Sequence, residues 1–156
     1  MKTKAKIAWA YLSEIILSAT LTTLSCATYG FVETAKFVSI IASDVAAYVF
    51  SILLAGALAL IWTIFSKTDS AFYNWLSSRG ALNTFLQAFG YVVLVELLAV
   101  IFSILSKSIV DQNFLIVSAF IMFMGAINGL TMIANIFDLI KLNILFEQKH
   151  NNRPPL

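Results

Sequence analysis

The sequence has almost none of the side chains from which metal sites and most catalytic sites are built. It contains one cysteine, Cys26, and one histidine, His150, within 156 residues. A single cysteine excludes an intramolecular disulfide, and without a cluster of cysteine and histidine neither a zinc centre nor a histidine-based triad can be assembled. The sequence therefore predicts a protein that is not an enzyme and that uses no metal or cofactor.

Charge is also scarce, and both prolines lie near the C-terminal end. Only 12% of the residues are charged and 60% are hydrophobic, and the mean hydropathy is +0.90. This composition is typical of a membrane protein and not of a water-soluble domain. A chain of this length has room for about four membrane-spanning helices and for no separate soluble domain.

Four apolar blocks predict the spans, at residues 7–29, 45–65, 82–105 and 114–140. Each is long enough to cross a hydrocarbon core of ~30 Å as a helix. The expected fold class is an all-α integral membrane four-helix bundle, a single domain over residues 1–149 with a flexible tail at 150–156. Nothing breaks the last helix before about Lys149, so we expect it to extend beyond the bilayer into the cytoplasm.

The basic residues predict the orientation. Eight of the ten flank the ends of the chain or the loop between the second and third blocks, namely Lys2, Lys4, Lys6, Lys67, Arg79, Lys141, Lys149 and Arg153. Because basic flanks stay in the cytoplasm, both termini are predicted to be cytoplasmic, in a bacterial inner membrane. The start "MKTKAK" and the later "TLSC" resemble a cleaved signal, but Glu14 interrupts the apolar segment, so we expect the first block to be retained.

Glu14 and Glu96 are carboxylates inside apolar blocks, and these blocks contain no lysine or arginine. Counting residues places Glu96 near mid-membrane, at the level of Asn128, and Glu14 closer to the cytoplasmic surface, at the level of Asn135. An unpaired ionised carboxylate there costs several kcal/mol, so we expect Glu96 to be neutral, or to be ionised only beside water or a bound cation. Two interpretations stay open for each, a functional group and a helix-pairing device.

The fourth block also carries a polar stripe, which consists of Asn128, Thr131, Asn135 and Asp138. Their spacings of three, four and three place them on one helix face. Such a face is expected to meet protein or water and not lipid. Hydrogen bonds between helices are one interpretation, and the lining of a polar pore or proton relay is the other.

Small residues predict where helices pack closely. Gly125 and Gly129 form a GxxxG pattern, and Ser51, Ala55 and Ala59 repeat at the same spacing in the second block. Such residues let two helix backbones approach each other in a membrane. The pairs form either within one chain or between copies of it.

Two amphipathic segments are predicted on the cytoplasmic side, and the first favours a helix that lies in the inner headgroup layer, with a docking surface for a partner as the alternative. "SKTDSAFYNWLSSRG" is expected to form a short helix that begins at Thr68, Asp69 or Ser70 and closes at Gly80. The apolar face of this helix consists of Phe72, Trp75 and Leu76. The second segment, "KLNILFEQKH" at residues 141–150, has an apolar face of Leu142, Leu145 and Phe146. Three coverings remain open for the second face: the loop itself, another copy of the chain, and a soluble partner. A further short helix is expected at the outer surface in "GFVETAKFVSIIASD".

Three resemblances suggest functions. "LSEIILSATLTTLS" resembles the first helix of the small multidrug resistance transporters, which implies transport coupled to protons or cations, with Glu14 as the essential glutamate. "YVVLVELLAVIF", which contains Glu96, resembles the membrane component of the lambda Rex exclusion pair. The layout of four spans with cytoplasmic ends resembles the KwaA membrane subunit of the Kiwa anti-phage system.

The Kiwa resemblance implies a homo-oligomer that passes a signal to a soluble cytoplasmic partner and does not itself contact nucleic acid. The Rex resemblance implies an ion channel lined by Glu96 and the stripe that starts at Asn128. The function predicted from the sequence is an oligomeric inner-membrane subunit of a bacterial antiviral defence or stress-response system. It senses membrane perturbation and either signals to the cytoplasm or forms a pore. The alternatives are a small proton- or cation-coupled multidrug-type transporter and an accessory subunit of a larger membrane complex.

Overall fold

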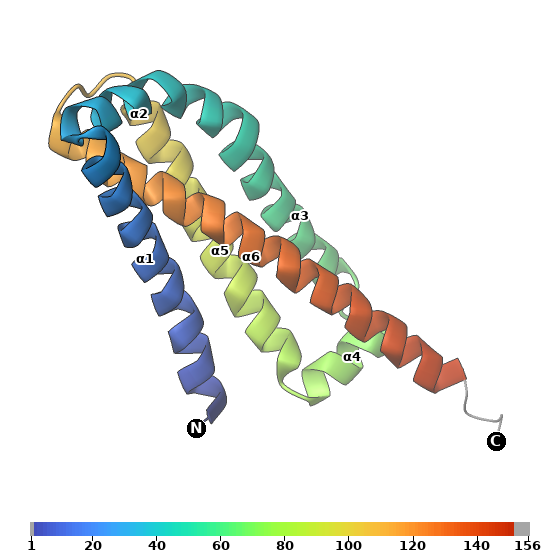
Figure 1. Ribbon diagram of the computed structural model, residues 1–156. Helices are drawn as coiled ribbons and strands as arrows, with labels where there is room; N and C mark the ends of the chain where they lie inside the picture. Colours follow the sequence, from blue (N-terminus) through green and yellow to red (C-terminus); the bar gives the residue numbers. More distant parts are fainter. Residues whose placement is uncertain (1, 152–156) are drawn as a thin grey trace.

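The structure is a computed structural model that describes the backbone of residues 2–151 and the side chains of Trp9 and residues 11–149. The described chain consists of helices and short turns (Figure 1). In order, the elements are α1 (Lys2–Tyr29), α2 (Phe31–Val45), the π-helical turn η1 (Ala46–Phe50), α3 (Ser51–Ser66), α4 (Ala71–Ser78), α5 (Ala81–Leu105) and α6 (Gln112–Asn151). The all-α class is confirmed. The tail predicted at 150–156 lies outside the described residues, except that the backbone of 150 and 151 continues α6.

Three described segments are long and apolar enough to span a membrane: Phe31–Ser66, Ala81–Leu105 and Gln112–Lys149. The second, third and fourth predicted spans fall inside these segments. The described part of α1 is not one of the three, so a membrane-spanning role for residues 7–29 stays a prediction.

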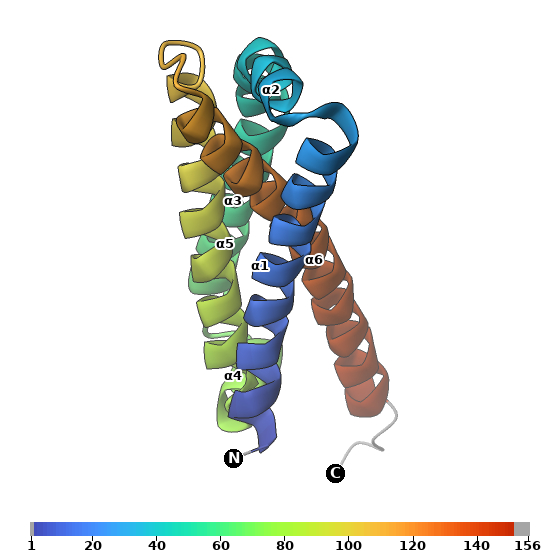
Figure 2. The same ribbon diagram turned by 60° about the vertical axis from the view of Figure 1, so that its left-hand side comes forward.

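Helices α1, α3 and α5 run along the length of the molecule, and α6 crosses them obliquely (Figures 1 and 2). The start of α1 and the end of α6 lie at the same end of the molecule as α4, whereas the α1–α2 junction lies at the opposite end. With 40 residues, α6 is about 60 Å long, roughly twice the hydrocarbon thickness. This length agrees with the extension beyond the bilayer that the sequence predicts, which stays a prediction.

The helix predicted at the outer surface exists as α2, but it does not end in a loop. It continues through η1 into α3, and the chain changes direction along this segment (Figure 1). Within the π turn the Ser51 hydroxyl donates to the Ala46 carbonyl at 2.7 Å. A π turn bulges out of the regular helix, and this one places Phe50, which is 1% exposed, in the core.

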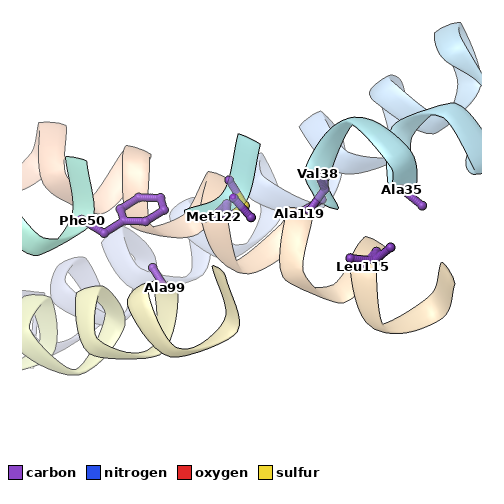
Figure 3. Close-up of a cluster of buried hydrophobic side chains, with 8 residues drawn as sticks. Ala35, Val38, Phe50, Ala99, Leu115, Ala119 and Met122 are labelled. Atoms are coloured by element: carbon purple, nitrogen blue, oxygen red, sulfur yellow. The ribbon is translucent and has the colours of Figure 1, made fainter. Parts of the chain in front are cut away.

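The part of the core nearest the α1–α2 junction, called the upper core, lies where α2, η1, α5 and α6 meet (Figure 3). A Cβ atom added to Gly125 would lie 2.9 Å from the Ala99 Cβ and 2.9 Å from Phe50 Cε1, and one added to Gly129 would lie 2.6 Å from Leu53 Cδ1. Both glycines of the GxxxG pattern thus sit at close helix approaches within the chain. Their partners are α5, η1 and α3 and not another copy.

The other small-residue pattern does not face the chain's own helices. Ser51, Ala55 and Ala59 are exposed, and Ala57 is the fully buried small residue of α3. The three predicted residues therefore pair no helices within this chain, because the contact face of α3 is set by Leu53 and Ala57. Their role in contacts between copies stays a prediction.

Helix α4 has the ends predicted from its sequence. Its N-cap is Ser70, whose hydroxyl oxygen accepts a hydrogen bond from the Tyr73 N–H at 3.4 Å, which satisfies a free donor of the first turn. At its other end Gly80 has φ 68°, a left-handed conformation that glycine adopts without strain. These two residues turn the chain from α4 into α5.

Candidate functional site

A hydrogen bond between buried side chains joins the first and last helices. The Asn128 amide nitrogen of α6 donates to Glu14 Oε2 of α1 at 2.9 Å. Glu14 is 6% exposed and Asn128 is 1% exposed. The bond links residues 114 positions apart in the chain, so it fixes the contact between α1 and α6 in the middle of the molecule.

Aromatic side chains from α1 and α5 lie beside this pair. The rings of Tyr11 and Tyr91 are 4.4 Å apart between centroids, and the Tyr91 hydroxyl lies within interaction range of the Glu14 carboxyl. Glu14 thus contacts both α5 and α6. Three helices converge on one carboxyl group.

Glu96 lies fully buried on α5 and has no partner within the described chain. Its exposed fraction is 0%, and neither carboxyl oxygen has a hydrogen-bond partner there. A Cβ on Gly129 would lie 3.5 Å from Glu96 Oε1, so the carboxyl group lies against the backbone of α6. Asn128, the neighbour of this glycine, also leaves its Oδ1 without a partner. In its neutral form Glu96 has a carboxyl O–H group that can donate a hydrogen bond. The atoms without a partner in this region, such as Asn128 Oδ1, can accept one.

The depths predicted by counting residues were wrong for Glu14. The sequence placed it level with Asn135, but it reaches Asn128, two helical turns further from the end of α6. Counting assumes that all helices stand parallel, whereas α6 crosses α1 obliquely (Figure 2). The crossing brings the middle of α6 to Glu14, and Glu96 lies beside the same turn of α6.

The rest of the predicted stripe does not gather at this site. The Thr131 hydroxyl donates to the Ile127 carbonyl of its own helix at 3.1 Å. Asn135 is half-buried, and Asp138 is exposed, where it lies 3.9 Å from Lys141. Helices α1 and α6 diverge towards this end of the molecule (Figures 1 and 2). Within one chain, therefore, only Asn128 of the stripe joins the buried polar cluster.

The two faces predicted for partner docking cover each other. The Phe146 ring lies 5.7 Å from that of Phe72 and 5.5 Å from that of Trp75. Leu76 is 1% exposed, and Leu142 packs into the same cluster. Of the three coverings left open by the sequence, the structure has the loop. Only Leu145, at 61% exposure, stays open to another molecule.

Sequence reasoning missed several buried polar residues of α1 and α5. Ser18 and Thr22 are buried on the same face of α1 as Glu14, and their hydroxyls donate to the carbonyls of Glu14 and Ser18. Ser103 is 0% exposed and its hydroxyl has no partner in the described chain. The sequence did contain a signal for them. Glu14, Ser18 and Thr22 follow each other at spacings of four, and Ser103 follows Glu96 at a spacing of seven, so each set lies on one helix face.

The fold and the cluster define an all-helical protein with three helices suited to a membrane and ionisable groups buried where its helices cross. Among the described residues, no group of three or more His, Cys, Asp or Glu side chains is placed to hold a metal ion. Comparison with protein-family models, with curated proteins and with solved structures finds no match to this chain.

Proposed function

We propose that this chain is a protonation-sensitive inner-membrane subunit of a bacterial defence or stress-response system. The observation that carries the proposal is the pairing of a bonded carboxyl, Glu14 on Asn128, with a fully buried and unpartnered one, Glu96, beside the same turn of α6. Ionisable groups held inside a membrane are functional candidates because keeping them there is costly.

Burial couples the charge of Glu96 to the packing of its helices. An ionised carboxylate without a partner is stable only where water or a cation reaches it. A disturbance that admits water between α5 and α6 favours the ionised form, and the ionised form in turn favours the hydrated, looser arrangement. The group therefore acts as a switch between two packings of the bundle.

Helix α6 carries the change to the far end of the molecule. It continues without a break from Asn128 to Phe146, which contacts α4. These residues are 18 positions apart, about 27 Å along a helix, so a tilt of about 5° at Asn128 moves Phe146 by about 2 Å. That movement changes the contact between α4 and α6, where we place the signal to a cytoplasmic partner or to a second copy.

The test is to follow the α4–α6 contact while the membrane is disturbed. In a Trp9→Phe, Trp62→Phe background, Trp75 is the one tryptophan left of three, and its fluorescence reports on the ring of Phe146. In vesicles, collapse of a proton gradient with an uncoupler is expected to change this emission. Glu96→Gln, which removes the titrating proton, is expected to abolish the change.

Thr131→Val is the matched control, because Thr131 belongs to the predicted stripe but bonds only within its own helix. Its vesicles are expected to respond as the parent does. A response that survives Glu96→Gln unchanged would refute the proposal.

A second candidate function is proton-coupled transport. It is favoured by Glu14, a buried carboxyl on the first helix flanked by Tyr11 and Tyr91. The measurement is proton flux driven by lipophilic cations in vesicles. Transport requires that Glu14→Gln abolish the flux, whereas the switch requires no flux at all.

A further inference from the structure

A cavity lies outside the polar cluster, at the end of the molecule opposite α4. Its volume is about 550 Å³, and it opens between the end of α1, α2 and α6. Tyr29, Glu33 and Phe37 lie at its exposed mouth, and the buried Val38 and Met122 form its floor. Val38 and Met122 also belong to the upper core, and Figure 3 labels both side chains. The volume falls in the range of sites for small ligands.

The walls are suited to a hydrocarbon chain. Nine of the ten lining residues are uncharged, and the aromatic rings of Tyr29, Phe37 and Phe123 contribute to them. The cavity lies next to Gly30, where α1 ends and the chain turns into α2. With α2 at the outer membrane surface, as the sequence predicts, this is the level at which acyl chains meet headgroups.

A carboxylate lies at the mouth of the cavity, and a lysine lies beside it on α2 without lining the cavity. Glu33 lines the cavity, and Lys36 follows it by three residues on α2, so the two lie about 5–6 Å apart between Cβ atoms. Both are exposed. The ion pair found among the described residues joins Asp138 and Lys141, so Glu33 and Lys36 are not in direct contact with each other.

We propose that this cavity binds one zwitterionic phospholipid of the ethanolamine type. The acyl chain fills the apolar cavity down to Val38 and Met122, the ammonium group contacts the Glu33 carboxylate, and the phosphate contacts the Lys36 ammonium. The adjacent charges match the two charges of such a headgroup, and an anionic lipid without an amine lacks the group that Glu33 selects. This assignment does not depend on the proposed switch at Glu96.

The test is native mass spectrometry of the purified full chain after addition of equal amounts of phosphatidylethanolamine and phosphatidylglycerol with identical acyl chains. One tightly held phosphatidylethanolamine is expected, preferred by about tenfold, which one charge-assisted contact supplies. Glu33→Gln is expected to remove the preference, and Lys36→Gln to weaken binding of both lipids.

Ser25→Leu fills the cavity from α1 and is expected to abolish the tight adduct. Thr23→Leu is its control on the same helix, because Thr23 faces a different, shallow depression. Circular dichroism checks that each variant keeps its helices. Equal adducts of both lipids that ignore Ser25→Leu would indicate surrounding bilayer lipid only and overturn the proposal. Dodecyltrimethylammonium bound in a Glu33-dependent way, without any phospholipid adduct, would overturn it as well.

Discussion

At the scale of single residues, Glu96 is the side chain whose burial most needs a cause. It is fully buried and its two oxygens have no partner in the described chain. Replacing such a group by an apolar one of similar volume is neutral or stabilising when packing alone matters. We therefore predict that Glu96→Met keeps or raises the stability, by up to about 1–2 kcal/mol, while the fluorescence response to uncoupler is lost. Thermal unfolding in mild detergent measures the first effect, and a loss of stability would assign Glu96 a structural role.

For the hydrogen bond between Glu14 and Asn128 we expect the opposite, namely that removing it lowers the stability. Asn128→Leu leaves the buried Glu14 carboxyl without its donor, which is expected to cost about 1–3 kcal/mol. A double-mutant cycle with Glu14→Met, which removes the acceptor oxygen, should give a coupling energy of about 1 kcal/mol, as hydrogen bonds within membranes do. Reversible unfolding of the four proteins in one detergent provides the numbers. Strictly additive effects would mean that the 2.9 Å contact contributes nothing.

The sequence predicted Glu14, Glu96 and Asn128 as buried polar residues because a charge or amide inside an apolar block has few other places to go. It did not predict their pairing. The partner of Glu14 depends on the angle at which α6 crosses α1, and residue counting does not contain that angle. Tyr91 was missed for the same reason, since a tyrosine in an apolar block is unremarkable until its neighbour is known.

At the scale of helices, the two glycines of α6 are expected to differ in what they tolerate. A methyl group at Gly125 meets the Ala99 Cβ, which cannot move without its backbone, and the Phe50 ring. At Gly129 it meets the end of the Leu53 side chain, which can change rotamer. Gly125→Ala is thus predicted to cost about 1–3 kcal/mol, and Gly129→Ala less than about 1 kcal/mol, because alanine also favours the helix.

Thermal unfolding of the two variants tests this contrast directly. Gly56→Ala on α3 is the control, because no atom lies within 4 Å of the Cβ that it adds. Equal losses at the two glycines of α6 would show that the crossing of α5 and α6 is not set by the contact with Ala99.

In the two amphipathic segments, the sequence pattern predicts which residues form the apolar faces but not what covers them. Their apolar faces were predicted residue by residue, and Ser70 and Gly80 bound the short helix as expected. Periodicity states that a face is covered but not by what, so the contact of Phe146 with Phe72 and Trp75 was one of three coverings that the sequence left open. A partner site on this end therefore has to use the residues that the contact leaves exposed.

Leu145 provides that test. It is 61% exposed beside the covered Phe146, so Leu145→Asp is expected to leave the α4–α6 contact and the stability unchanged but to release a soluble cytoplasmic partner. Affinity purification from the native host in mild detergent, with the partner quantified in both samples, is the measurement. Phe146→Asp is the contrasting variant, since it opens the contact itself. A partner retained by Leu145→Asp would move the docking surface elsewhere.

At the scale of the whole molecule, the arrangement in the membrane follows from where the helices end. The start of α1, helix α4 and the end of α6 lie together, and the α1–α2 junction and the turn after α5 lie at the other end (Figures 1 and 2). Of the nine basic residues whose backbone is described, seven belong to the first of these ends and two, Lys36 and Lys107, to the other, which is the pattern of a cytoplasmic side. The remaining question is whether α1 crosses the bilayer with the three more apolar segments.

Labelling of single cysteines decides this in a Cys26→Ser background. A membrane-impermeant maleimide is expected to label Asp111→Cys in intact spheroplasts, and to label Ser77→Cys and Gln148→Cys only after permeabilisation. Trp9→Cys, near the start of α1 and 66% exposed, is expected to behave like Ser77→Cys if α1 spans the membrane and Glu14 reaches Asn128 from within the bundle. Labelling of Trp9→Cys from outside would instead place α1 on the outer surface and give the protein three spans. That result would be incompatible with the buried hydrogen bond between α1 and α6, on which the proposed switch depends.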